Sequence, residues 1–131
     1  MPIYANSTRE TVEIPGIRHQ TLAGSIDGLR EMETWMQTIA PHSATPVHRH
    51  EAEEVIVVLK GHGRCTIAGQ STDFGPETTI VVPSNVVHDI ANTGDEEMWI
   101  VASLSRAPVE VRTGEGEVMA LPWDPATSAA E

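Results

Sequence analysis

Short runs of β-branched and apolar residues, separated by glycine, proline and asparagine, recur along most of this chain. Val, Ile and Thr dominate these runs, as they do in strands, and the runs begin roughly every 8–12 residues. This pattern predicts an all-β sandwich or barrel. The expected strands cover residues 17–23, 54–60, 64–68, 78–82, 86–91, 98–104 and 109–112.

One stretch, residues 29–40, has a pattern that favours a helix on local evidence. Its apolar residues recur at helical spacing from Leu29 to Ile39, and Asp27 stands where it could cap a helix. A strand is the alternative, with weaker support from alternation. The pattern alone leaves both interpretations open.

The length of 131 residues, with 40% hydrophobic side chains, is that of one folded domain. We expect residues 1–20 to form an N-terminal arm or edge strand and residues 21–113 to form the barrel. Residues 114–131 are rich in Pro and Ala, so we expect a tail that is mobile or packed on a partner chain.

The excess of acidic side chains excludes two classes of binding partner. Eight basic against 19 acidic side chains give a net charge of −11, which excludes a basic nucleic-acid footprint and an electrostatic membrane anchor. Cys65 is the only cysteine, so no intramolecular disulfide can form. The first residues are polar and show no apolar segment of a signal peptide, so we expect a cytoplasmic location.

The histidines carry the candidate chemistry. Because side chains alternate along a strand, His48 and His50 project from the same face and can both reach one metal ion. Glu54 opens the next expected strand, and His88 lies in a later one. Three nitrogens and one oxygen suit Fe(II), Mn(II), Ni(II), Cu(II) or Zn(II) better than Ca or Mg. A His-x-His pair is also a common surface feature, so the spacing alone does not show whether His48 and His50 bind a metal ion.

The same residues resemble the two signature motifs of the cupin family. The first motif has a His-x-His pair, a glutamate and a glycine, and the second has a glycine, a proline, a histidine and an asparagine, at spacings that this chain meets. The matching positions are His48, His50, Glu54 and Gly61 in the first motif, and Gly75, Pro83, His88 and Asn92 in the second.

Two positions depart from the family pattern. The glycine that opens the first motif is His42 here, and the glycine after the proline of the second motif is Asn85. Asparagine tolerates left-handed backbone angles better than most residues, so the second turn should survive.

The resemblance implies a cupin-type double-stranded β-helix, or jelly-roll barrel. It implies that residues 29–40 are a strand leading into the first motif. It also implies that His48, His50, Glu54 and His88 hold one divalent transition metal ion.

The resemblance further implies a function centred on that ion. It favours a metal-dependent enzyme, most simply a dioxygenase-like oxidoreductase acting on a small organic acid, diketone or aromatic. A non-catalytic ligand-binding protein and a metal-dependent isomerase or lyase are the alternatives. We expect Trp35, Gln37 and Met98 to line a substrate pocket. An isomerase or lyase would need a second acid or base, for which His42 and Glu53 are candidates.

A lone small barrel has sheet edges to cover. We therefore expect a homodimer, in which the N-terminal arm or the tail with Trp123 crosses to the partner.

Overall fold

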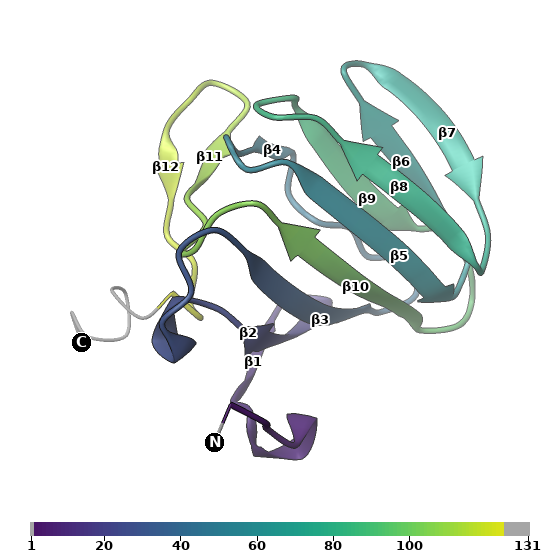
Figure 1. The fold of residues 1–131 in the computed structure, drawn as a ribbon. Helices are drawn as coiled ribbons and strands as arrows, with labels where there is room; N and C mark the ends of the chain where they lie inside the picture. Colours follow the sequence, from purple (N-terminus) through teal and green to yellow (C-terminus); the bar gives the residue numbers. More distant parts are fainter. Residues whose placement is uncertain (1, 125–131) are drawn as a thin grey trace.

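Two antiparallel sheets of six strands each face one another in the computed structural model, which describes residues 2–124 (Figure 1). The strand order is β1-β2-β3-β10-β5-β8 in the first sheet and β12-β11-β4-β9-β6-β7 in the second. The elements are η1 (Asn6–Thr8), β1 (Thr11–Ile14), β2 (Ile17–Ala23), η2 (Ser25–Asp27), β3 (Glu33–Ile39), β4 (His48–Arg49), β5 (Glu54–Lys60), β6 (Gly63–Ile67), β7 (Gln70–Phe74), β8 (Thr78–Val82), β9 (His88–Asn92), β10 (Met98–Leu104), β11 (Val111–Thr113) and β12 (Val118–Met119).

The chain passes repeatedly from one sheet to the other. β4 lies in the second sheet, β5 in the first, β6 and β7 in the second, β8 in the first, β9 in the second and β10 in the first. This alternation is the course of a jelly roll, so the predicted fold class is confirmed. Among residues 2–124, no helix is long and apolar enough to cross a membrane.

The core lies between the sheets and follows the alternation of side chains. Along β5, Glu54, Ile56 and Val58 are buried while the residues between them are exposed. Along β10 every second residue from Met98 to Leu104 is buried. Each of these strands therefore has one face in the core and one face outside it.

The stretch with helical spacing is a strand over most of its length. β3 pairs with β2 on one side and with β10 on the other, so its backbone donors and acceptors are satisfied within the sheet. Leu29 and Met32, which began the helical pattern, precede the strand and are exposed. Tertiary pairing therefore outweighs the local periodicity, as the family resemblance predicted.

Two strands were not expected from the sequence. β7 is polar and exposed on both faces apart from Phe74, so it carries no alternating pattern. It forms a hairpin with β6 through Ala68 and Gly69, which both have positive φ, of 50° and 82°. β12 has only two residues and pairs with β11. Pairing partners, rather than hydrophobicity, define both strands.

The segment expected as a mobile or partner-bound tail packs against its own chain as far as residue 124. Leu121 is buried, and the Trp123 ring stacks on His19 with 3.7 Å between the ring centroids. Residues 125–131 of that expected tail lie outside the described residues. Within residues 1–20, β1 forms the outer edge of the first sheet and β2 begins at Ile17.

Both positions where this chain lacks a motif glycine adopt left-handed backbone angles. His42 has φ 60° and Asn85 has φ 63°. The turns that the family builds with glycine are therefore kept here. The motif glycine that is retained, Gly61, has φ 108°, and an added Cβ would lie 2.9 Å from the Met98 backbone.

His19 is a fully buried histidine in β2. The Gln37 amide nitrogen donates to its Nδ1 at 2.9 Å, and its Nε2–H donates to the Thr21 hydroxyl at 2.8 Å. Burial lowers the pKa of His19 from 6.5 to about 3, because none of these partners compensates for lost hydration of the charged ring. The ring is therefore neutral in the folded protein near neutral pH.

Replacing Gly61 by alanine should destabilise the fold more than the same change at Gly69. Both glycines have positive φ, which costs alanine about 1–2 kcal/mol, but only Gly61 also has a close neighbour. We expect the free energy of unfolding to fall by about 1 kcal/mol for G69A and by about 2–4 kcal/mol for G61A, because overpacking adds to the strain. Urea denaturation measures both values, and equal losses would show that Met98 does not crowd this turn.

Acid should destabilise the wild type more steeply than the variant His19→Gln. Below pH 6.5 the unfolded chain binds a proton at His19 that the folded chain does not bind until about pH 3, so stability falls as pH falls through this window. Between pH 7 and pH 5 this residue should account for about 2 kcal/mol of lost stability. Chemical denaturation of both proteins across that range tests it. Identical slopes against pH would contradict a neutral, buried His19.

Candidate metal centre

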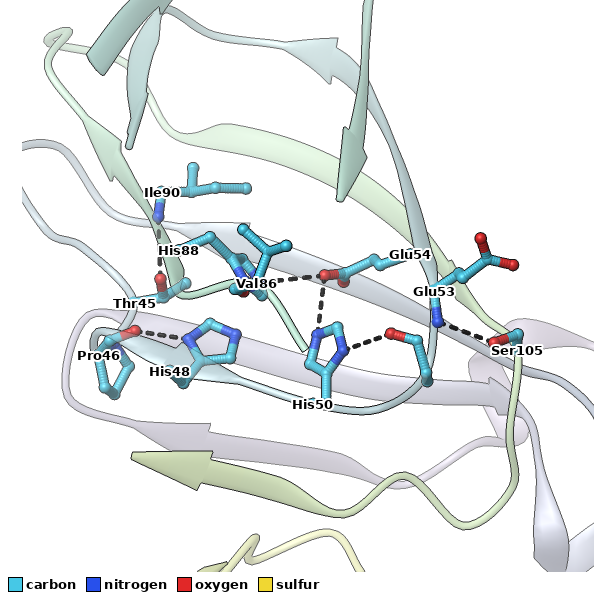
Figure 2. Close-up of polar contacts among 11 residues, drawn as sticks. Thr45, Pro46, His48, His50, Glu53, Glu54, Val86, His88, Ile90 and Ser105 are labelled. Carbon is cyan, nitrogen blue, oxygen red and sulfur yellow. Dashed lines mark hydrogen bonds and ion pairs between the residues drawn. The ribbon is translucent and has the colours of Figure 1, made fainter. Parts of the chain in front are cut away.

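Three imidazoles from neighbouring segments of the second sheet converge between the two sheets (Figure 2). His48 lies in β4, His50 directly follows that strand, and His88 opens β9 opposite His48. One ligand nitrogen from each ring lies within 4.8 Å of the others. The rings of His48 and His88 are the closest pair, with 4.3 Å between centroids. The three histidines therefore form a candidate metal site.

A backbone carbonyl orients each of the three rings. In every case Nδ1 lies within hydrogen-bond distance of a carbonyl two residues away, so Nδ1–H donates to that carbonyl and Nε2 faces the interior. The pairs are His48 with Pro46 at 2.6 Å, His50 with Ala52 at 2.8 Å, and His88 with Val86 at 2.8 Å. A further bond, from the Asn85 amide to the His50 carbonyl at 2.7 Å, links the two motifs.

Glu54 brings a buried carboxylate to the same point. Its Oε1 lies 3.1 Å from Nε2 of His50 and 3.2 Å from Nε2 of His88. Burial alone would raise the pKa of Glu54, but the hydrogen bond from His50 and the nearby charge of both histidines outweigh it and lower the pKa to about 2. The carboxylate is therefore ionised at neutral pH.

The imidazoles differ in their affinity for a proton. Burial lowers the pKa of His48 to about 4, and the charge of His88 adds to this effect. Burial would also lower the pKa of His50, but its hydrogen bond to Glu54 and the carboxylate charge raise it above its usual value. A cation that binds here must displace any proton shared by His50 and Glu54.

One buried atom shows that the donor set suits a cation. His88 Nε2 has no hydrogen-bond partner among the described residues, although the Glu54 oxygen lies near it. A buried polar atom without a partner is costly, and the Nε2 lone pair of His88 and the ionised carboxylate oxygens of Glu54 also repel one another. A borderline divalent transition ion would satisfy all of them.

A cavity of about 80 Å³ opens beside these ligand atoms. His48, Glu54 and His88 form one part of its wall, and Gln37 and Thr45 add the other polar side chains of the described lining. The remainder is almost entirely apolar and includes Ile14, Ile17, Trp35, Ile56, Ile90, Ile100, Val111, Met119 and Trp123. The cavity therefore pairs a polar end with an apolar body.

Two of the three residues expected to line a substrate pocket lie in the wall of this cavity, and the third does not. Trp35 and Gln37 line the cavity, whereas Met98 does not. Met98 lies six residues from Leu104, the residue of β10 that pairs with Glu54, so it is roughly 20 Å away along the strand. It is fully buried near Gly61 instead.

The two expected acid–base residues lie outside the cavity. His42 is exposed and its Nε2 lies 3.1 Å from an Asp95 oxygen. Glu53 is exposed, its carboxylate points away from the imidazoles in Figure 2, and its backbone amide donates to the Ser105 hydroxyl. Because Glu53 and Glu54 are neighbours at the start of a strand, only one of them can face the core.

The cavity residue that sequence reasoning placed elsewhere is Trp123. It was expected on a mobile or partner-bound tail, but it lies against both His19 and Trp35, with 5.5 Å between the two tryptophan centroids. The feature of the sequence that could have indicated a packed Trp123 is a single large aromatic residue in a segment otherwise rich in Pro and Ala.

Residues 4–123 match the family model described as auxin binding protein. The chain belongs to the auxin-binding protein family. It is 42% identical over 107 residues to auxin-binding protein 1 of Arabidopsis thaliana, covering 74% of this chain and 54% of the relative. It is 42% identical over 108 residues to auxin-binding protein T85 of Nicotiana tabacum, covering 73% and 58%. The chain thus spans somewhat more than half the length of these relatives.

Similar solved structures support the cupin fold. An RmlC-like cupin from Shewanella frigidimarina has a TM-score of 0.72 at 17% identity, covering 82% of this chain and 93% of that structure's chain. A polyketide cyclase from Streptomyces resistomycificus has a TM-score of 0.69 at 22% identity, covering 100% and 94%. At these identities the similarity concerns the fold alone. This member of the auxin-binding protein family therefore has the cupin fold.

Replacing His88 by glutamine should abolish tight metal binding, while the same change at His42 should not. H88Q removes one of the three converging nitrogens, whereas His42 is exposed at a distance from the cavity. We expect the affinity for Zn(II) or Co(II) to fall by more than about a hundredfold, because losing only a hydrogen-bond partner of a metal ligand already costs about tenfold to a hundredfold. Metal content after dialysis measures this. Equal metal content in H88Q, H42Q and the wild type would place the metal elsewhere.

Proposed function

We propose that this protein is a metal-dependent binding protein for a small carboxylic acid with an apolar or aromatic body. The observation that carries the proposal is the cavity itself. It joins a cluster of metal-ligating side chains at one end to a wall that is otherwise almost entirely apolar. A site of this kind fixes a ligand by a few polar contacts and binds its body by burial.

The ion would be held by His48, His50 and His88, with Glu54 as the fourth ligand. Three imidazole nitrogens and one carboxylate oxygen suit Fe(II), Mn(II), Ni(II), Cu(II) or Zn(II). When bound, the ion supplies a Lewis-acidic positive charge that can attract an oxygen of the ligand. Glu54 is ionised, so it offsets one of the two positive charges and leaves one for an anionic ligand.

The body of the ligand would lie against the apolar wall. Trp35 and Trp123 meet edge to face there, and isoleucine side chains fill the remaining surface. Flat aromatic groups pack well in such surroundings. The relatives are named for binding auxin, and indole-3-acetic acid, an auxin, has both the carboxylate and the aromatic body that this cavity favours.

Binding without turnover agrees better with the polar residues of the cavity than catalysis does. Apart from His48, Glu54 and His88, the described lining contains no titratable side chain. Gln37 and Thr45 can bind and orient a ligand, but they are poor general acids or bases at neutral pH. His42 and Glu53 lie elsewhere, so the described lining offers no second group of the kind that an isomerase or lyase would need.

Calorimetry with indole-3-acetic acid and its methyl ester tests the proposal. The Zn(II)-loaded protein should bind one acid per chain, and the ester, which lacks the charge, should bind at least tenfold more weakly. Metal-free protein and H88Q should lose this preference, while H42Q should keep it. Equal affinity for acid and ester would contradict recognition of the carboxylate at the ion. Consumption of dioxygen by the Fe(II)-loaded protein with the acid would support an oxygenase instead.

A further inference from the structure

Two arginines stand directly opposite each other in the second sheet. Arg49 of β4 pairs with Arg112 of β11, and directly paired residues project from the same face with about 5 Å between their Cβ atoms. His48 and His50 direct their rings to the interior, so the alternation of side chains places Arg49 on the outer face. Like charges that stand directly opposite destabilise a sheet, so this pair needs a physical explanation.

The turn between β11 and β12 brings the two guanidinium groups together. Arg112 Nη1 donates to the Gly116 carbonyl at 2.8 Å. A Cβ added at Gly116 would lie 2.8 Å from Arg49 Nη2, so this nitrogen lies directly against the same glycine. Figure 1 shows the hairpin of β11 and β12 beside β4. Both guanidinium groups therefore meet at Gly116.

Arg49 has no partner for its charge in the described part of the chain. No hydrogen bond or ion pair joins its guanidinium to another group among residues 2–124. Its Nε is buried, whereas Nη1 and Nη2 remain accessible, so the buried stem holds the group with its two outer nitrogens toward solvent. Arginines elsewhere in this acidic chain pair with carboxylates, as Arg64 does with Asp73. A half-buried, unpaired guanidinium is therefore a distinct local feature.

The carboxylates near the two arginines leave one positive charge uncompensated. Glu110 Oε1 lies 2.6 Å from Arg112 Nη2 and neutralises that arginine. Glu115 and Glu117 in the turn are exposed, and within the described residues neither pairs with a guanidinium group. Arg112 uses two of its five N–H donors for Glu110 and the backbone. Donors of both arginines are thus available to an anion.

We propose that Arg49 and Arg112 form a binding site for a phosphate group, carried by free phosphate or by a phosphate monoester. Guanidinium groups match the oxygens of carboxylates and phosphates in bidentate geometry. One guanidinium can use both oxygens of a carboxylate, whereas the additional oxygens of a phosphate can bridge two guanidinium groups. Negative charge between Arg49 and Arg112 would also remove the repulsion between them.

The phosphate site is separate from the metal centre. Arg49 projects to the opposite face of the sheet from the two neighbouring histidines, and the described lining of the cavity includes neither arginine. Val118 pairs with Arg112 and is 58% exposed, so it offers an apolar surface to the organic part of a monoester. A phosphate here and an acid in the cavity should therefore bind independently.

NMR titration of the isotopically labelled full chain with inorganic phosphate tests the proposal. The Nε–H signals of Arg49 and Arg112 and the Gly116 amide signal should shift and saturate, equally in metal-free and Zn(II)-loaded protein. Acetate at the same ionic strength should bind about tenfold more weakly or worse, because it offers fewer oxygens. Phenyl phosphate distinguishes the sources: tighter binding than inorganic phosphate indicates a monoester, and equal binding indicates free phosphate.

Substitutions separate a defined site from general attraction of anions. Arg49→Gln and Arg112→Gln should each weaken phosphate binding by about fivefold or more, since each removes a charged donor. Arg49→Lys keeps the charge but loses the planar fork, so it should also bind more weakly than the wild type. The matched control Arg64→Gln removes another arginine that pairs with a carboxylate and should leave binding unchanged.

Arg112→Gln keeps the test decisive if Arg49→Gln, which lies between two metal ligands, does not fold. Shifts that do not saturate, or equal affinity for phosphate in Arg112→Gln and Arg64→Gln, would overturn the proposal. Equal affinity in Arg49→Lys and the wild type would overturn it as well, because charge alone would then account for binding.

Discussion

The site depends on a single constraint: three imidazoles, those of half-buried His48 and of buried His50 and His88, must direct Nε2 toward one point, and a backbone carbonyl accepts a hydrogen bond from Nδ1 of each. This requires His48 and His88 to face each other across β4 and β9 while Glu54 approaches from the other sheet. A jelly roll meets the requirement because consecutive strands alternate between sheets, so the His-x-His segment and Glu54 end on opposite walls of one interior. The Asn85 amide, bonded to the His50 carbonyl, holds the two motifs in register.

The wall of the cavity depends on a second feature, the buried and uncharged imidazole of His19. His19 satisfies both ring nitrogens with Gln37 and Thr21, remains neutral, and offers a flat surface on which Trp123 stacks. The last described segment thereby becomes a wall of the cavity. Gln37 is itself a cavity residue, so its hydrogen bond to His19 connects the cavity wall to the core, and ring stacking adds Trp123 to the same group.

The sequence was informative where a residue's role depends on its local spacing. The jelly roll, and the strand at Glu33–Ile39, followed from the cupin motifs against the local helical pattern. The spacing of the motifs also singled out the histidines that the structure brings together. Spacing could not show that the strand Gln70–Phe74 exists, because a polar edge strand has no alternation. Spacing also could not place Trp123, whose position depends on a contact with His19, which is distant in the sequence. Nor could it place His42, whose position depends on which side of its turn faces solvent.

X-ray absorption spectroscopy of the Co(II)- or Zn(II)-loaded protein tests the central claim most directly. We expect one ion per chain, with three imidazole nitrogens and at least one oxygen in the first coordination shell and no sulfur. A shell with fewer than two imidazoles, or one that is unchanged when His88 is replaced by glutamine, would contradict it.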